Sequence, residues 1–361
     1  MGIMAPVLGT LADRIGYRPV LLLSLSLSAL GLILVGAASY LWVMAIGMIV
    51  LGIGGVGFGP PLMAYLSGRL PSARRARGLG FVETSWALSG LIGVSLTGLM
   101  IERWGWRVPF FVLGIGLMIG CVVLGKWDFI DGTHQATPKP STIEPEALLK
   151  RLRSVFSLGP DNRSTWSTVL VMGLVGFSGM HASIMYGTWL HAEYSLGAAR
   201  LGIVALFIGV ADLSGSVLVS LAGDRLGRRA TLLLGIAGSI AAYSLLPLFN
   251  RGLVISVVGI TAFRLCFEVS TVACAPLLSE LATRQRAKAF AVGLLFGFGG
   301  YSVASLTGPA AYASHGVLGL GVVSAATSVV SLVVVLFLIR APSQSEHDER
   351  LVLTVESGPS R

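Results

Sequence analysis

The segment GTLADRIGYRPVLL, residues 9–22, is polar and turn-forming in its first half and apolar in its second half. Asp13, Arg14, Gly16 and Arg18 stand directly before a long apolar run. A charged turn followed at once by such a run is typical of a loop that leads into a buried or membrane-spanning helix. The composition of the remaining chain decides between these two settings.

That composition favours the membrane. Hydrophobic residues make up 54% of the 361 residues and charged residues only 12%, and the mean hydropathy is +0.82. We therefore expect an all-α, polytopic membrane protein. A span needs about 20 mostly apolar residues. Stretches that meet this requirement are 20–38, 42–66, 79–101, 108–126, 165–190, 200–222, 230–249, 253–280, 288–311 and 316–339.

The basic residues indicate the orientation. Most of the 26 Lys and Arg residues fall in alternate loops, which the positive-inside rule places in the cytoplasm together with the tail 341–361. We expect a multi-pass protein of the plasma (inner) membrane with a cytoplasmic C-terminal tail. Because the basic residues form short clusters between apolar runs instead of one basic face, the net charge of +9 does not indicate nucleic acid.

The one long polar connection between predicted spans, residues 127–164, separates two halves. Within it, apolar residues between 148 and 156 recur at helical spacing opposite basic ones, which predicts an amphipathic helix on the membrane surface. The predicted domains are an N-terminal bundle at 1–126, the cytoplasmic inter-bundle loop at 127–164, a C-terminal bundle at 165–340 and the tail.

The two halves repeat each other. LADRIGYRPVLL at 11–22 aligns with AGDRLGRRATLL at 222–233, with Asp13 on Asp224 and Gly16 on Gly227. LPSARRARG at 70–78 aligns with LATRQRAKA at 281–289 at the same offset. Two loops in register predict parallel structural repeats. When the same offset is subtracted from the start of the first span in the second half, the equivalent position lies before Met1. We therefore expect that one full span and most of another have no counterpart in this sequence.

At this point a family resemblance is evident. GTLADRIGYRPVLL resembles the loop signature between helices 2 and 3 of the major facilitator superfamily, and SLAGDRLGRRATLL at 220–233 is similar to its repeat between helices 8 and 9. The resemblance extends to about residue 340 and in detail is to bacterial drug or sugar efflux permeases. It implies two six-helix bundles, here without helix 1 and most of helix 2, and rocker-switch alternating access. LIGVSLTG at 91–98 lacks the proline of the family's antiporter motif, with Val94 after Gly93.

The resemblance also implies a cytoplasmic gate. A carboxylate at a helix start or beside an Arg is stabilised by the helix dipole and by charge-assisted hydrogen bonds. The alternative is that the segment is a simple turn whose basic residues only mark the cytoplasmic side. Glu280 is expected in a charge network with the arginines after it. The expected gate residues are Gly9, Asp13, Arg14, Gly16, Arg18, Asp224, Arg225, Gly227, Arg228, Glu280, Arg284 and Arg286.

Charges inside spans are costly and are by default functional. Arg264 and Glu268 stand four apart on one predicted helix and so share a face, which allows them to pair, and Asp212 lies at a similar depth in another. Protonation of an acid paired with an Arg would release the Arg and exchange a proton for a substrate. A permanent structural ion pair is the alternative.

Four further residues are candidates for a substrate cavity. Glu83 and Trp86 lie three apart on one face of a span, where a carboxylate beside an aromatic ring suits a cationic ligand, although Glu83 could instead serve the gate. His181 and Tyr186 could line the outer half of the cavity, although a lone His is more often a packing residue.

These features predict a secondary active transporter of a small organic solute, with proton-coupled efflux by alternating access. Import by symport and a truncated, non-transporting remnant or scaffold are the alternatives. The sequence contains no P-loop, GxSxG or HExxH motif, so we expect no enzyme activity, no metal and no cofactor beyond the proton gradient. The expected partners are the small-molecule substrate and the lipid bilayer, with no nucleic acid, and the expected oligomeric state is a monomer.

Overall fold

The computed structural model describes residues 11, 15–69, 82, 85, 88–126, 158, 161–282 and 286–339, with the backbone alone at 60, 63–69, 222, 224, 286 and 287. All regular structure in this part of the chain is helical. Seven of its helices are long and apolar enough to cross a membrane. Their bounds are Tyr17–Ala37, Leu41–Gly59, Val108–Lys126, Asn162–Tyr194, Ala198–Leu221, Leu253–Leu281 and Lys288–Leu338.

The chain divides into two compact units. The first contains Met1–Thr142 and His191–Val210, and the second contains Ile143–Leu190 and Ala211–Arg361. The boundary at 210 falls inside the continuous helix α10 (Ala198–Leu226), so the first three turns of this helix pack with the first unit and the remainder with the second.

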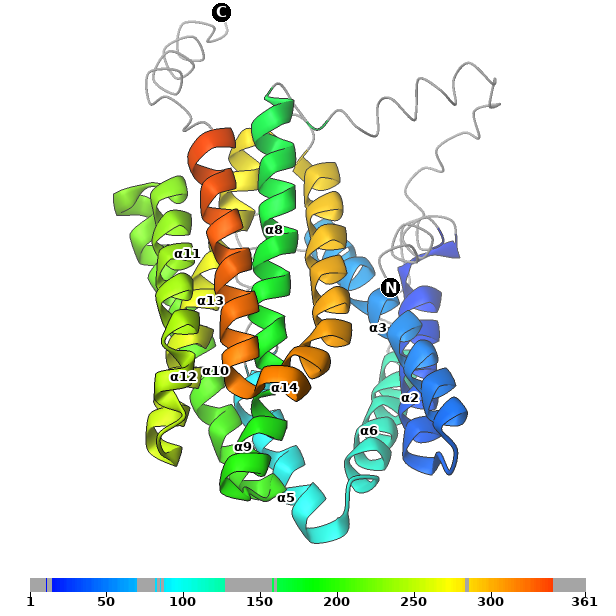
Figure 1. Cartoon of the computed structure of the whole chain (residues 1–361). Helices are drawn as coiled ribbons and strands as arrows, with labels where there is room; N and C mark the ends of the chain where they lie inside the picture. The colour runs from blue at the N-terminus through cyan, green and yellow to red at the C-terminus, as the bar shows by residue number, and fades with distance from the viewer. Residues whose placement is uncertain are drawn as a thin grey trace, which may run out of the picture. The chain divides into compact units, whose positions relative to one another are not determined.

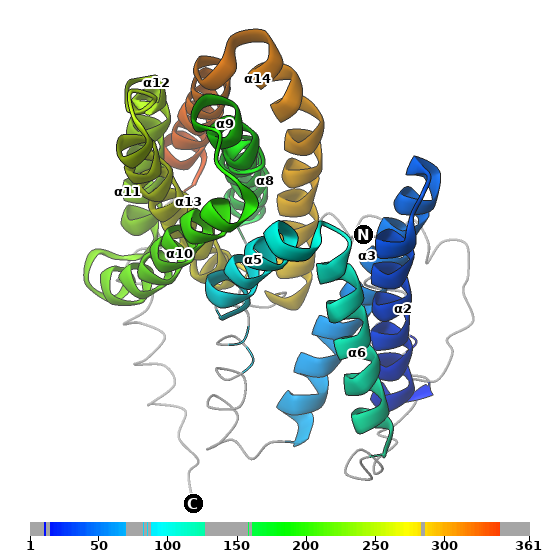
Figure 2. The ribbon, with the colours of Figure 1, turned by 90° about the horizontal axis from the view of Figure 1, so that it is seen from below.

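In the first unit, α2 (Tyr17–Ala37) packs between α3 (Leu41–Arg69) and α6 (Val108–Lys126) (Figure 2). The helices approach closely at small residues: a Cβ on Gly54 would lie 2.5 Å from the backbone nitrogen of Ser28. Such contacts are common where apolar helices pack without a hydrophobic driving force between them. Arg107 at the start of α6 donates to the carbonyl oxygen of Ala38 at 3.0 Å, which holds the ends of α2 and α6 together.

A π-helical turn (η1, Ser89–Gly93) leads into α5 (Val94–Trp104). It lies at the position where the sequence departs from the antiporter motif. Within the same unit, α5 packs on the start of α10: the hydroxyl of Ser95 donates to the carbonyl oxygen of Gly202 at 2.8 Å. The carboxylate of Glu102 accepts from the backbone N–H of Ala199 at 2.6 Å, and so it caps the first turn of α10.

The second unit contains α8 (Asn162–Ser183), α9 (Tyr186–Tyr194) as far as Leu190, α11 (Arg228–Ser244), α12 (Leu246–Phe249), α13 (Leu253–Leu281) and α14 (Arg286–Leu338). Its helices α8, α11, α13 and α14 run side by side (Figure 1). Asp161 begins α8 because its carboxylate accepts from the backbone N–H of Ser164 at 3.1 Å.

Breaks in the helical backbone fall within or between predicted spans of the second unit. The stretches 288–311 and 316–339 lie within α14 as two helices on either side of a kink, as the sequence predicts, because the backbone at Gly316 is non-helical, with φ 57° and ψ −141°. The stretch 230–249 is helical in two pieces, α11 and α12, with Pro247 in the first turn of the second piece. Proline is favourable there because the first turn lacks an intrahelical acceptor for its N–H.

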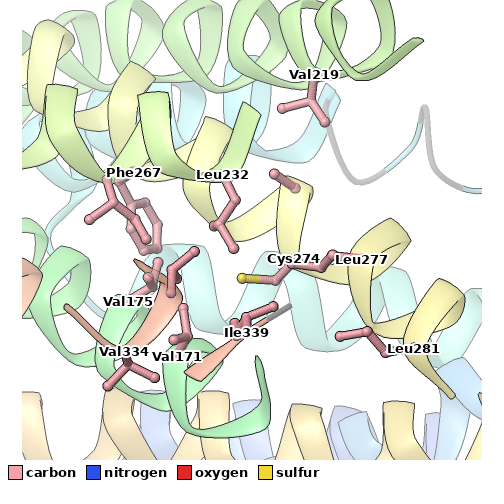
Figure 3. Packing of buried hydrophobic residues seen from close by; sticks show 13 residues of the cluster. Val171, Val175, Val219, Leu232, Phe267, Cys274, Leu277, Leu281, Val334 and Ile339 are labelled. Atoms are coloured by element: carbon pink, nitrogen blue, oxygen red, sulfur yellow. The ribbon is translucent and has the colours of Figure 1, made fainter. Parts of the chain in front are cut away.

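The core of the second unit joins α8, α10, α11, α13 and α14. Val171, Leu232, Cys274 and Val335 are fully buried, and Figure 3 shows side chains of this cluster converging from separate helices. Large apolar side chains on the described helices are exposed, for example Leu306 at 79% and Phe337 at 76%. Exposed apolar side chains of this kind are expected where a helix is surrounded by lipid instead of water.

The sequence repeat is also visible in the structure. Gly16 and Gly227 occupy equivalent positions at the starts of α2 and α11, and both have positive φ, 94° and 84°. Glycine adopts this conformation without the steric cost that a Cβ introduces. The loop signature therefore requires its glycine for a backbone turn that occurs in both halves.

The arginine two residues after each glycine makes the same contact. Arg18 donates to the carbonyl oxygen of Gly125 at 2.6 Å, and Arg229 donates to that of Leu336 at 3.0 Å. Gly125 and Leu336 are equivalent positions near the ends of α6 and α14. A cation is favourable at a helix C-terminus, where carbonyl oxygens lack intrahelical donors, so each arginine ties the start of one helix to the end of another.

Candidate functional site

A partly buried ion pair joins α10 and α13 in the second unit. Arg264 donates from Nε to Oδ1 of Asp212 at 3.1 Å and from Nη2 to Oδ2 at 2.6 Å. Its Nη1 donates to the hydroxyl of Ser183 on α8 at 3.1 Å. The side chains of Arg264 and Asp212 remain 15% and 30% exposed. A bidentate pair of this kind is stronger and more specific in direction than a single charge contact.

Glu268 lies one turn further along α13, beside this pair. Its Oε1 accepts from the hydroxyl of Ser216 on α10 at 3.1 Å. The two helices approach closely here, because a Cβ on Gly215 would lie 2.9 Å from the Cβ of Glu268. The spacing of Arg264 and Glu268 allows them to pair, but the guanidinium forms its hydrogen bonds to the carboxylate of Asp212 across the helix interface.

Aromatic side chains lie near the charged groups. The Arg264 guanidinium lies over the ring of Phe267, with Cζ 4.9 Å from the ring centroid. Tyr186 on α9 and Tyr243 on α11 lie within electrostatic reach of Arg264. Tyr301 on α14 lies within reach of Arg264, Asp212 and Glu268. Phe267, Tyr243 and Tyr301 were not singled out from the sequence, where aromatic residues in apolar runs carry no signal of which face they occupy.

His181 lies on α8 and is fully buried. Its ring packs on that of Phe177, with centroids 5.3 Å apart, and the backbone of Thr307 on α14 lies near the ring. Neither ring nitrogen has a hydrogen-bond partner within the distance and angle limits of a normal bond. His181 is thus a packed residue between α8 and α14, whereas Tyr186 is partly exposed.

The described gate residues gather at the ends of helices. Arg228 forms an ion pair with Glu280 at 3.3 Å and donates to the carbonyl oxygen of Pro276 at 3.2 Å, which connects the start of α11 to the end of α13. Arg225 is exposed at the end of α10. Glu280 is thus paired with Arg228, whereas the side chains of Arg284 and Arg286, with which the sequence predicts a charge network, lie outside the described residues.

The remaining predicted site residues lie outside the described part of the chain. These are Gly9, Asp13, Arg14, Glu83, Trp86 and Arg284, together with the side chains of Asp224 and Arg286; the amphipathic helix at 148–156 and the tail 341–361 lie there too. Within the described residues, no group of three or more His, Cys, Asp or Glu side chains is placed to hold a metal ion.

Comparison with known proteins identifies the family. The sequence profile described as Major Facilitator Superfamily matches residues 1–211 and 168–354. The chain belongs to the Major Facilitator Superfamily. The resemblance carried by the loop signature is therefore confirmed, and the all-helical membrane fold is that of this superfamily.

Several relatives in the superfamily are similar to this chain. An uncharacterized MFS-type transporter, YceJ, of Bacillus subtilis is 26% identical over 68% of this chain and 60% of its own length. The class G tetracycline resistance protein of Vibrio anguillarum is 28% identical over 69% and 62%. The multidrug resistance protein MdtG of Salmonella arizonae is 30% identical over 66% and 57%. The chain thus matches about three fifths of the length of these relatives.

A solved structure has the same fold. The crystal structure of a D-xylose-proton symporter superposes with a TM-score of 0.71 at 17% identity, over 94% of this chain and 84% of that one. At this identity the likeness shows the superfamily fold alone.

Proposed function

We propose that this chain belongs to a secondary active transporter that exports a small organic solute in exchange for protons. The observation that carries the proposal is the Asp212–Arg264 ion pair with Glu268 beside it, well inside the spans Ala198–Leu221 and Leu253–Leu281. Ionisable groups at such depth are costly and usually belong to a substrate or proton pathway. Membership in the superfamily and similarity to drug-resistance proteins support it.

The arrangement provides a way to couple export of the solute to entry of a proton. When Asp212 is ionised, it holds Arg264 in a bidentate contact; a proton on Asp212 would weaken that contact and free the guanidinium to reorient. Glu268, bonded to a neutral hydroxyl, would take up or release a proton without breaking an ion pair. Binding of a substrate and of a proton would thus favour different states of one network.

The loop residues would control access. In this proposal, Gly9, Asp13, Arg14, Gly16 and Arg18, with their repeat at Asp224, Arg225, Gly227 and Arg228 and the nearby Glu280, Arg284 and Arg286, form the cytoplasmic gate between bundles at 1–126 and 165–340. The Arg228–Glu280 ion pair and the helix-end contacts of Arg18 and Arg229 support a structural role at helix termini. Glu83, Trp86 and Tyr186 remain candidate cavity residues, whereas the fully buried His181 fits the packing role.

We further propose that the protein acts as a monomer in the inner membrane, with its tail in the cytoplasm and with no cofactor beyond the proton gradient. The distribution of Lys and Arg supports this orientation.

Transport in everted membrane vesicles tests the proposal, with tetracycline as the probe because two relatives carry it in their names. We expect accumulation when the vesicle interior is acidified by respiration, and its loss when an uncoupler is added. Glu268→Gln and Asp212→Asn should each reduce the initial rate about tenfold or more, since each removes an ionisable group from the proposed coupling site.

Glu193→Gln is the matched control, because Glu193 is an exposed carboxylate at the end of α9. Normal gradient-driven transport by both Glu268→Gln and Asp212→Asn would contradict the coupling assignment. Uptake of the solute by whole cells, driven by a proton gradient that is acidic outside, would instead indicate symport.

A further inference from the structure

We propose that Ser183 is the positioning residue of Arg264. Its hydroxyl holds the guanidinium in the orientation that binds both oxygens of Asp212, and it connects this ion pair to the break between α8 and α9. The consequence for transport rests on the proposed function, which is deepened by a residue that was not singled out from the sequence. The contacts that carry the proposal are made by the last turn of α8.

The hydroxyl of Ser183 has a fixed direction. It donates its hydrogen to the carbonyl oxygen of Gly179, one turn back on α8, at 2.7 Å. A serine hydroxyl has one donor hydrogen and two acceptor sites, so a lone pair remains for Nη1 of Arg264, 3.1 Å away. Because its hydrogen is engaged, the hydroxyl acts as an acceptor for the guanidinium and does not compete for it by donating to Asp212.

The same turn of α8 also supports the ring beneath the guanidinium. Phe267 packs so closely on Gly179 that its ring occupies the space that a Cβ would need. Arg264 lies over this ring, with Cζ 4.9 Å from the centroid. One turn of α8 therefore holds the guanidinium in two ways, through the ring and through the bond from Nη1 to Ser183. A guanidinium oriented in advance loses less freedom when it binds a carboxylate through two bonds.

Ser183 also lies where the helix is interrupted. It is the last residue of α8, and beyond it the backbone N–H of Met185 donates to the carbonyl oxygen of Ala182, three residues back instead of four, at 3.3 Å. Asp212 lies on α10, shortly after the part of that helix that belongs to the first unit. Arg264 therefore bonds to one residue before the α9–α10 connection and to one residue near its end, and joins both α8 and α10 to α13.

The two contacts of Arg264 differ in what breaks them. A proton on Asp212 weakens the bidentate contact, whereas the neutral hydroxyl of Ser183 keeps its acceptor site. The guanidinium thus stays attached to α8 when Asp212 releases it, and it turns about the Ser183 contact. In this way Ser183 transmits the change at the ion pair to the break between α8 and α9.

Hydrogen exchange of backbone amides tests the positioning role without substrate or gradient. The purified chain in nanodiscs is exchanged and digested, and mass spectrometry follows the peptide that contains Ile184 and Met185. Ser183→Ala should raise the exchange rate of these amides about fivefold or more, because the break loses a hydrogen bond to a charged group. Two variants should exchange as the wild type does: Ser183→Thr, which keeps a hydroxyl able to bond to the preceding turn, and Ser302→Ala, which removes an exposed hydroxyl bonded within α14.

A comparison of backgrounds separates positioning from simple packing at the break. The double variant Asp212→Asn with Arg264→Met removes both charges together and leaves no guanidinium for Ser183 to hold. In this background, Ser183→Ala should cause little further increase in exchange, because the two sites act through one interaction. Unchanged exchange in Ser183→Ala, no recovery in Ser183→Thr, or an equal increase in the background without the guanidinium would each overturn the assignment.

Transport in everted vesicles tests the consequence. Ser183→Ala should lower the maximal rate of gradient-driven tetracycline transport about fivefold and leave KM within about twofold, since a positioning residue acts on the conformational step. A raised KM at an unchanged maximal rate would overturn the positioning role. If exchange responds as expected while Glu268→Gln and Asp212→Asn both transport normally, the positioning role stands and the proposed function falls. Unchanged exchange in Ser183→Ala, with gradient-driven transport that depends on Glu268 and Asp212, has the reverse meaning.

Discussion

At the scale of single residues, the central feature is the bidentate contact between Arg264 and Asp212. Spacing along one helix allows Arg264 to pair with Glu268, since residues four apart share a face. The observed partner lies 52 positions away in sequence, on α10. Residue types and depth thus identified the three charged groups, but the pairing among them depends on how two helices face each other.

The ion pair predicts an asymmetric effect on stability. Asp212→Asn leaves the Arg264 charge without its partner and should lower the free energy of unfolding by about 3–5 kcal/mol. The double variant Asp212→Asn with Arg264→Gln removes both charges and should recover most of that loss. Thermal unfolding in detergent, followed by fluorescence, measures both effects; a double variant no more stable than Asp212→Asn would show that the pair is not the source of the loss.

At the scale of helices, packing is controlled by small residues at the contacts. Helix α8 meets the first part of α14 so closely that a Cβ on Gly300 would lie 2.1 Å from the carbonyl oxygen of Gly173. Backbone cannot move away as easily as a flexible side chain. The abundance of glycine, 47 residues, is consistent with such contacts, but only the structure shows which of them tolerate no Cβ.

Two adjacent glycines provide a matched comparison. Gly300→Ala should destabilise the protein by about 1–3 kcal/mol, because the added methyl group forces α8 and α14 apart. Gly299→Ala should be neutral or stabilising by up to about 1 kcal/mol, because no atom lies within 4 Å of its Cβ position and alanine favours a helix. Thermal unfolding of the two variants tests this difference, and similar values would show that the close approach does not control stability.

At the scale of the whole molecule, the sequence predicts orientation in the bilayer from the basic loops. In each described half, an arginine after the loop glycine binds the carbonyl oxygens at the end of a later helix. These arginines therefore have a structural contact in addition to their contribution to topology.

Labelling of single cysteines tests the orientation. In a variant whose native cysteines are replaced by serine, Arg251→Cys should react with a membrane-impermeant maleimide in intact cells, because its loop is predicted to face outward. Ser343→Cys, in the tail, should react only in everted vesicles. Labelling of both positions from the same side would contradict the predicted topology.

The sequence by itself determined that the chain is helical and membrane-spanning, because composition and the length of apolar runs depend only on the solvent that each residue must face. It also identified the loop signature, its repeat and the in-span charges, since charged and turn-forming residues are conspicuous in apolar runs. Only the tertiary structure decided that Arg264 bonds Asp212 across a helix interface and that Tyr243 and Tyr301 lie near the charges. Those features depend on the rotation and close approach of one helix against another, which the glycine contacts control and which no local pattern specifies.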